Sequence, residues 1–274
     1  MERIVSAQNS RIKNVQTLIA KSKERKTRGL FIVEGVREIS LALAGSYGFD
    51  SVFYCPELFT DTEMLRFVNP KILCEVSAAV FGKIACRENS GGILAIAGAK
   101  KLDLSSLHLP ENPFVILLES VEKPGNLGAI LRTADAAGVD ALIVCDPLTD
   151  VYNPNTIRSS IGCVFTVPVA VSDNAGALSF LKERHIRTFA AELQASQCYH
   201  ETDFRGPSAI VMGTEAEGLS PFWLKNADAG IKIPMRGKID SLNVSVSTAV
   251  ITFEAMRQRS GEKSVDRVRT VGNS

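Results

Sequence analysis

Three short stretches in the second half of the chain combine glycines with polar side chains at points where apolar segments end. They read NLGAILR (126–132), GTEAEGLS (213–220) and IPMRGKIDSLNVSVSTAV (233–250). Together they supply guanidinium, carboxylate, amide and hydroxyl groups, which can hydrogen-bond a polar ligand. Their glycines allow the backbone to approach such a ligand closely. These stretches are the candidate functional site.

The first stretch is predicted to form a helix that ends at Gly138 and has its apolar residues on one face. Asn126 is predicted to cap this helix, because its side-chain oxygen can accept an N–H group of the first turn. Arg132 lies off the apolar face among short neighbours, namely Gly128, Ala129, Asp135 and Ala136. Its guanidinium is therefore open to a ligand or to another surface. The alternative is an exposed Arg132–Asp135 ion pair, which adds little stability.

The second stretch follows an apolar strand that ends at Gly213. Its loop carries Glu215 and Glu217, and Ser220 and Pro221 are predicted to be the N-cap and the first residue of a new helix. Two glycines around a carboxylate permit close approach of a ligand. The alternative is that both glutamates are merely solvated.

The third stretch places Gly237, Asp240, Ser241 and Asn243 between a strand and the last helix. Ligands bind at the carboxyl ends of strands in open α/β sheets, so this loop is a candidate binding loop. A dinucleotide site is disfavoured, because the first turn of this half, ESVEKPGNLGA, lacks the GxGxxG pattern that cradles a pyrophosphate.

The elements that must position these residues divide the 274 residues into two α/β units. In the first unit, helices and strands alternate as a small sandwich. Its predicted helices span 10–22, 35–44 and 77–85, and its predicted strands span 30–34, 51–55, 71–76 and 92–98. Residues 99–113 lack periodicity and contain two prolines, which favours a linker.

The second unit alternates more strictly and is predicted to be doubly wound. FVILLE (114–119) is an apolar run typical of a strand buried on both faces of a parallel sheet. Further predicted strands lie at 141–145, 166–171, 187–193, 209–213 and 230–234, and further helices at 155–162, 175–185 and 221–227. The polar tail, 261–274, is predicted to fray.

Charge and cysteine content bear on three questions: nucleic-acid binding, zinc binding and location in the cell. The net charge is only +1, but residues 11–28 carry seven cations against the single acid Glu24. Such a run is either a solvated helix face or a nucleic-acid contact. The six cysteines form no CxxC pair, which disfavours zinc. No signal-peptide core and no run of about 18 apolar residues is present, so we expect a cytoplasmic protein with reduced thiols and no membrane contact.

The three stretches, taken in order, resemble the SpoU (TrmH-type) family of RNA ribose 2′-O-methyltransferases in the SPOUT superfamily, over residues 112–260. DSLNVSV is the most specific part. The first half is similar to the L30e-like substrate-binding domain, on RGLFIVEGVREI and GGILAIA. The expected division is an L30e-like domain at 1–98, a linker at 99–111, a methyltransferase domain at 112–260 and a tail at 261–274.

The resemblance implies an α/β fold whose carboxyl-terminal segment threads a trefoil knot, an exception to the usual rule against knots. It implies S-adenosylmethionine as cofactor, bound near Gly213, Ile233, Met235 and Leu242, and a homodimer with the active site near the interface. No metal is required. The expected partner is RNA, with rRNA favoured over tRNA because the L30e-like module accompanies the rRNA enzymes of the family.

By resemblance, Arg132 activates the ribose hydroxyl, while Asn126, Glu215, Ser241 and Asn243 position it and the loops. Ser241 and Asn243 are expected to bond nearby backbone groups while Leu242 covers the adenine. The expected RNA contacts are the cations of the amino-terminal run: Arg11, Lys13, Lys21, Lys23, Arg25, Lys26 and Arg28. Two alternatives are a catalytically inactive RNA-binding or ribosome-assembly protein, and a methyltransferase of small molecules.

Overall fold

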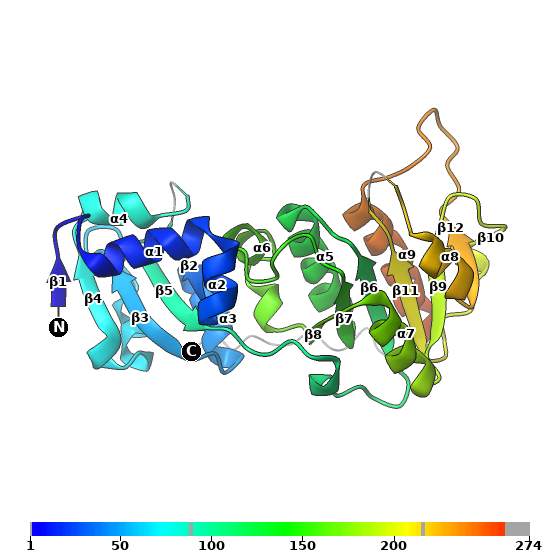
Figure 1. The fold of residues 1–274 in the computed structure, drawn as a ribbon, viewed down its shortest axis with the longest axis horizontal. Helices are drawn as coiled ribbons and strands as arrows, with labels where there is room; N and C mark the ends of the chain where they lie inside the picture. Colours follow the sequence, from blue (N-terminus) through cyan, green and yellow to red (C-terminus); the bar gives the residue numbers. More distant parts are fainter. Residues whose placement is uncertain (1, 88–89, 215–216, 261–274) are drawn as a thin grey trace.

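The computed structural model describes residues 2–87, 90–214 and 217–260. In it the chain forms two β-sheets that lie side by side along the long axis (Figure 1). The first sheet has the order β1-β4-β3-β5-β2, in which β5 is antiparallel to β2 and β3. Its strands are β1 (Glu2–Ile4), β2 (Leu30–Glu34), β3 (Phe49–Tyr54), β4 (Leu73–Val76) and β5 (Ile93–Gly98).

The helices of the first half differ from prediction at one place. The predicted helix 10–22 is split, because Lys21 is extended (φ −119°, ψ 106°). The second piece ends at Gly29, whose φ of +61° favours glycine. The helices are α1 (Ser10–Ala20), α2 (Ser22–Arg28), α3 (Val36–Ala44) and α4 (Ala78–Ile84), with 3₁₀ turns at Thr62–Phe67 and Pro70–Ile72. β1 and α2 were not predicted.

The second sheet confirms the doubly wound prediction. Its described strands are all parallel, in the order β10-β12-β9-β11-β6-β7-β8, so the chain extends the sheet first to one side of β6 and then to the other. The strands are β6 (Phe114–Glu119), β7 (Ala141–Cys145), β8 (Val169–Ser172), β9 (Arg187–Ala191), β10 (Gln197–Cys198), β11 (Ser208–Met212) and β12 (Ala229–Lys232).

The helices of the second half follow the predicted positions to within a few residues. They are α5 (Pro124–Ala137), α6 (Pro154–Ser159), α7 (Asn174–Glu183), α8 (Pro221–Asn226) and α9 (Val244–Arg259), with 3₁₀ turns at Leu104–Ser106, Cys163–Phe165 and Tyr199–Glu201. Every residue of β6 is buried, as its apolar run predicts. Only the short β10 has no counterpart among the predicted strands.

Two helix starts bear directly on the site. α5 begins at Pro124 with Lys123 as its N-cap, so Asn126 lies within the first turn and the predicted capping role is wrong. Proline at the first helical position explains the earlier start, since it has no N–H to satisfy. Asn243 caps α9, and its Oδ1 accepts from the Ser245 N–H at 2.9 Å. The segment 244–259 is therefore a helix, as predicted, and not a strand.

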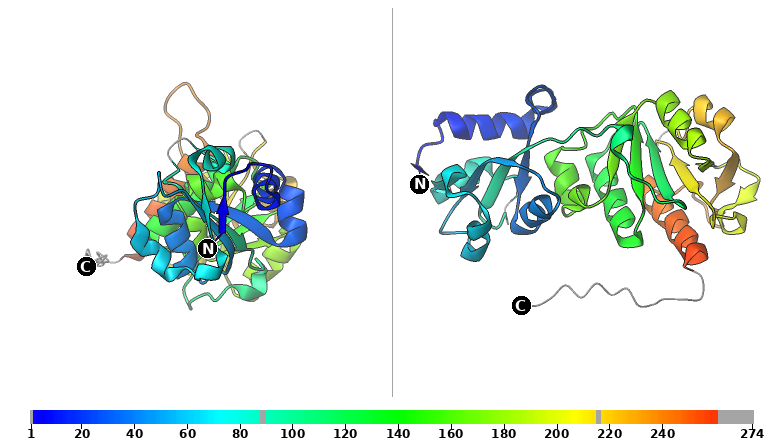
Figure 2. Two further views of the ribbon diagram at one scale, coloured as in Figure 1. Left: turned by 90° about the vertical axis from the view of Figure 1, so that its left-hand side faces the viewer. Right: turned by 90° about the horizontal axis from the view of Figure 1, so that it is seen from below.

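The two halves are joined by an aromatic cluster and a buried ion pair. Phe31 stacks on Tyr152 with ring centroids 4.3 Å apart, and the hydroxyls of Tyr47 and Tyr152 are 3.2 Å apart. Arg25 Nε lies 2.7 Å from Asp150 Oδ2. Figure 2 shows the first sheet with its helices adjoining α6 and the segment after it. One hydrophobic cluster runs through both halves at this junction.

Candidate active site

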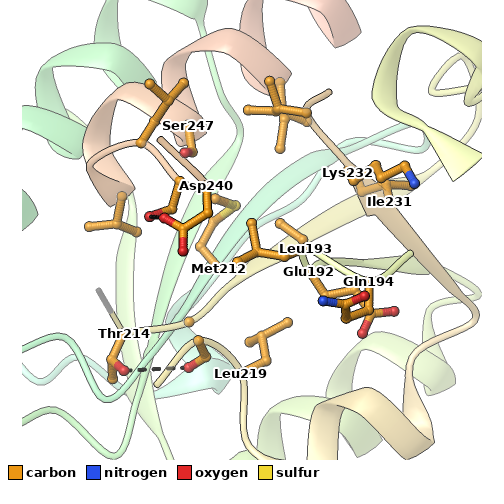
Figure 3. A pocket seen from close by; sticks show the side chains of 18 of the residues that line it. Glu192, Leu193, Gln194, Met212, Thr214, Leu219, Ile231, Lys232, Asp240 and Ser247 are labelled. Carbon is orange, nitrogen blue, oxygen red and sulfur yellow. Dashed lines mark hydrogen bonds between the residues drawn. The ribbon is translucent and has the colours of Figure 1, made fainter. Parts of the chain in front are cut away.

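A cavity of about 420 Å³ lies at the carboxyl ends of β9, β11 and β12. Residues that follow each of these strands line it, and so do the first turns of α9. Figure 3 shows Met212, Leu219 and Ile231 as an apolar floor, with polar side chains around it. Its volume falls within the range of about 300–1,000 Å³ that is typical of small-molecule sites.

This cavity brings together residues that lie far apart in the sequence. Gly213, Ile233, Met235 and Leu242, the four residues assigned to cofactor binding, all line it, and so does Ser241. They meet because the strands are parallel, which places the loops after β11 and β12 on the same edge of the sheet.

Gly213 is required by close packing of the loop that carries it. A Cβ at this position would overlap the backbone of Gly218 and Leu219. The loop closes on itself, since Thr214 N donates to Gly218 O at 2.9 Å and Gly218 N donates to Thr214 O at 3.1 Å. Gly218 itself has φ +71°, which favours glycine. Both glycines therefore set the shape of one wall of the cavity.

The sequence reasoning missed part of the polar wall. Glu192 and Gln194 follow β9 and, with Lys232 and Asp240, line the cavity (Figure 3). Asp240 was noted only as part of its loop. Their signal in the sequence is positional: Glu192 and Gln194 lie at and just after the end of the predicted strand 187–193, and the loops after parallel strands gather at the carboxyl edge.

A second cavity of about 520 Å³ adjoins the first. The two share Gly213, Thr214, Glu217 and Val244 among their lining residues. Asn126 lines the second cavity, and its Oδ1 accepts from Asn243 Nδ2 at 3.3 Å. The first and third stretches are thus in direct contact next to the loop of the second.

A buried carboxylate that the sequence reasoning missed holds this loop in place. Glu119, at the end of β6, is 4% exposed and accepts from Ser220 N (2.8 Å) and Ser220 Oγ (2.6 Å). Asn174 Nδ2 also donates to Glu119 at 2.7 Å, and Trp223 Nε1 donates to Asn174 Oδ1 at 2.7 Å. Ser220 is the N-cap residue of α8, as predicted, but its side chain bonds Glu119 and not the helix. The sequence signal was an acidic residue at the end of an otherwise apolar strand.

Arg132 is exposed on α5 and is not among the residues that line either cavity. Within the described ranges it has no ion pair with Asp135, whose Oδ1 accepts from Thr166 Oγ1 at 2.5 Å. Gly128 is not part of an open face as predicted, because a Cβ there would overlap Ser159 of α6. The guanidinium is free, as expected, but it projects from α5 outside the cavities of its own chain.

Two further predicted site residues remain to be placed. Glu215 lies outside the described residues. Ser241 Oγ donates to Asp240 Oδ1 at 3.0 Å, so it bonds a side chain and not the backbone group that was predicted. Asn243 makes the predicted backbone bond through its cap.

The seven cations of the amino-terminal basic run differ in how exposed they are. Arg25 is 4% exposed, pairs with Asp150 and also donates to Leu18 O at 2.7 Å, so its prediction as an RNA contact is wrong. Its position in the sequence suggested a solvated face, but α2 packs this side chain into the junction. Arg11 is half-buried and pairs with Glu2 at 2.5 Å. The exposed members are Lys13, Lys21, Lys23, Lys26 and Arg28.

The cysteines are unpaired, and most of them are buried. All six cysteines are free, and Cys55, Cys74, Cys145 and Cys163 are buried. Burial raises the pKa of the Cys86 thiol to about 12 and that of Cys163 to about 11, so neither is a thiolate at neutral pH. In the part of the chain that the structure describes, no three His, Cys, Asp or Glu residues are grouped to hold a metal ion. No described helix is long and apolar enough to span a membrane.

Comparison with known proteins agrees with this geometry. Residues 113–253 match the SpoU rRNA Methylase family, and residues 9–95 match the MRM3-like substrate binding domain. The chain is 29% identical over 266 residues to a 23S rRNA (uridine(2479)-2'-O)-methyltransferase of Streptomyces viridochromogenes, which covers 94% of this chain and 93% of that protein. It is 28% identical over 258 residues to the 23S rRNA (guanosine(2553)-2'-O)-methyltransferase RlmP of Bacillus subtilis strain 168, covering 92% and 98%.

A solved structure resembles the whole fold. The SpoU methyltransferase AviRb of Streptomyces viridochromogenes, in complex with the cofactor AdoMet, has a TM-score of 0.85 at 29% identity. The match covers 92% of this chain and 99% of that one. Both halves and their arrangement are therefore shared with a known protein.

Proposed function

The chain belongs to the SpoU rRNA methylase family, and from this premise we propose that it methylates a ribose 2′-hydroxyl of 23S rRNA with S-adenosylmethionine as donor. The observation that carries the proposal is the cavity itself: all four residues assigned to the cofactor line it, although they come from two separate loops. Its position at the carboxyl edge of a parallel sheet is where ligands bind in such folds.

The cavity suits S-adenosylmethionine in both shape and chemistry. Gly213 lets the loop that forms one wall of the cavity pack closely, and the apolar Met212, Leu219 and Ile231 offer a surface for the adenine. Carboxylates of Glu192 and Asp240 can accept from ribose hydroxyls or face a positive charge. When bound, the cofactor supplies an electrophilic methyl group on a sulfonium.

We propose that Arg132 would grip the phosphate beside the target ribose and stabilise the developing oxyanion, while the proton of the 2′-hydroxyl passes to solvent water. A guanidinium remains protonated at neutral pH, so it serves as a donor and not as a free base. Asn126 and Asn243, in contact with each other beside Gly213, would orient the ribose in the second cavity. Positioning of this kind contributes several kcal/mol to catalysis, on the order of 7–11 at most.

The knot and the homodimer that the resemblance implies belong to the same proposal. The segment after β12 leads into α9, which packs on α5, so the last helix lies against the helix of the first stretch. α9 has apolar residues on opposite faces: Ile251 and Ala255 are buried, whereas Val246 and Phe253 are 47% and 51% exposed. A second subunit over this face would cover the exposed residues and bring Arg132 to an interface.

The division of labour follows from the two sheets. We assign residues 1–98 to RNA binding, 99–111 to the linker, 112–260 to methyl transfer and 261–274 to a tail, in a cytoplasmic protein. The support is that the two family matches, 9–95 and 113–253, fall within the first and third of these ranges.

Ribose-methylation mapping of RNA from a deletion strain tests the proposal. We expect one 2′-O-methyl to disappear from 23S rRNA and to be restored in vitro by the purified protein with S-adenosylmethionine. An inactive RNA-binding protein would bind RNA, but its deletion would leave the methylation map unchanged. Calorimetry then tests whether the purified protein binds S-adenosylmethionine. Loss of a tRNA methyl group, with intact 23S rRNA, would contradict the substrate.

A further inference from the structure

Three exposed arginines on three different helices remain without a structural role. They are Arg37 on α3, Arg158 on α6 and Arg132 on α5. Within residues 2–87, 90–214 and 217–260, none of the three forms an ion pair with a carboxylate. Most other exposed arginines of the described chain are paired, as Arg205 is with Asp203 and Arg257 with Glu254.

The three helices form one continuous surface. α5 and α6 are in such close contact that a Cβ on Gly128 would overlap Ser159, the neighbour of Arg158. α3 packs against the turn after α6, where a Cβ on Gly162 would lie 2.8 Å from Leu41 Cδ1. In Figure 2 (right) α3, α6, α5 and α9 lie in a row along one side of the molecule.

Electrostatic effects on two thiols support this proximity. Burial and then Asp135 raise the pKa of Cys163, while Arg37 and Arg132 both lower it, so both guanidiniums lie within range of one group. Burial likewise raises the pKa of Cys86, and Arg158 lowers it although α6 belongs to the other half of the chain. Arg37 and Arg132, one from each half, thus lie near the same thiol, and Arg158 of the second half lies near a thiol of the first half.

Nearby carboxylates are already engaged. Glu38 is buried and lies 3.7 Å from Arg87, Glu34 accepts from Cys86 N at 3.0 Å, and Asp135 accepts from Thr166. Of these three carboxylates only Asp135 is exposed, so the three exposed arginines outnumber it on this surface. The stacked Phe31 and Tyr152 and the Arg25–Asp150 pair hold the two halves in a fixed relation, so the arginines need no rearrangement to present it.

We propose that RNA phosphates bind along Arg37 and Arg158 and lead the strand to Arg132, so that the substrate crosses the junction between the two halves. This inference rests on the proposed function, because it takes RNA as the substrate and Arg132 as the catalytic end of the track. Guanidiniums suit phosphate oxygens, which they bind through two parallel N–H groups. The residues differ from the basic run of α1 and α2, which lies on other helices.

Fluorescence anisotropy with a short labelled RNA stem-loop, titrated across salt concentrations, tests the track. For Arg37→Ala/Arg158→Ala in the full chain, we expect the slope of log affinity against log salt to fall by about two, since each lost phosphate contact removes roughly 0.9. At about 0.1 M salt the affinity should fall roughly 10- to 100-fold. Calorimetry should show unchanged S-adenosylmethionine affinity.

The matched control is Lys182→Ala/Arg187→Ala. It also removes two exposed cations, but they lie at the end of α7 and at the amino end of β9, away from the ligand edge. We expect the control to keep the wild-type salt slope. A wild-type slope in Arg37→Ala/Arg158→Ala, or an equal loss in the control, would overturn the track. A wild-type protein that binds the stem-loop but transfers no methyl group would contradict the proposed function and leave the track standing.

Discussion

Arg25 at the junction and Arg132 on α5 are both arginines of helices, yet the fold uses them in opposite ways. Arg25 is 4% exposed and bonded to Asp150, Leu18 O and Ile19 O. Arg132 is exposed and has no ion pair among the described residues. A buried, paired charge determines how the two halves are held together, whereas a free, exposed one is available to a ligand. Burial, not residue type, separates the arginine that joins the two halves from the one that we propose to be functional.

The largest effect is expected at Arg25. Arg25→Ala leaves the Asp150 carboxylate buried without its cation, so the free energy of unfolding should fall by roughly 3–5 kcal/mol. Replacing both partners, as Arg25→Met/Asp150→Leu, should recover much of the loss because no unpaired charge remains. Denaturant unfolding measures both, with the exposed neighbour Lys26→Ala as control. A loss below about 1 kcal/mol would show that the pair does not stabilise the junction.

Arg132→Ala should have the opposite effects: little change in stability and a large loss of methyl transfer. Stability should change by less than about 1 kcal/mol, because the side chain is exposed. Single-turnover methyl transfer should fall by a factor on the order of 10²–10³, as for loss of an oxyanion donor. Arg132→Lys should lose most activity as well, since lysine lacks the planar pair of donors. Near-normal rates in a folded, dimeric Arg132→Ala protein would refute the mechanism, and an inactive monomer would leave only an interface role.

Gly213→Val tests the loop of the second stretch, because it changes the packing of the backbone and leaves the charge unchanged. The added side chain would overlap Gly218 and Leu219, so the loop that lines the cavity must shift. We expect at least a tenfold loss of S-adenosylmethionine affinity, about 1.4 kcal/mol. Calorimetry on the folded variant measures it, with Gly206→Val as control because a Cβ there meets nothing within 4 Å. Unchanged affinity would place the cofactor elsewhere.

The smallest effect is expected on the exposed part of the basic run. Lys23→Glu/Lys26→Glu leaves the buried Arg25 intact, so it tests surface charge without weakening the junction. RNA affinity should fall roughly fivefold near 0.1 M salt, with a flatter salt dependence. S-adenosylmethionine affinity should not change. If RNA binding keeps its original salt slope, this face of α2 is solvated and does not contact RNA.

Local pattern was sufficient for most elements of the fold. The apolar run 114–119 predicts β6 without error, and the helix after Asn243 follows from its cap and periodicity. α2 and the extended Lys21 could not be predicted, because the residues around the break favour a helix and only packing of Arg25 against Asp150 turns the chain. Asn126 was misassigned as a cap because Pro124 starts the helix one turn earlier.

For the site, the sequence by itself determined the three stretches, and their resemblance to the SpoU family singled out the four residues that line one cavity. Only the tertiary structure decided which polar groups are buried, paired or free. It placed Glu119 under Ser220, Arg25 against Asp150 and Asn126 beside Asn243. The two partners of each contact lie about a hundred residues or more apart in the sequence. No local spacing encodes which distant partner a side chain will meet.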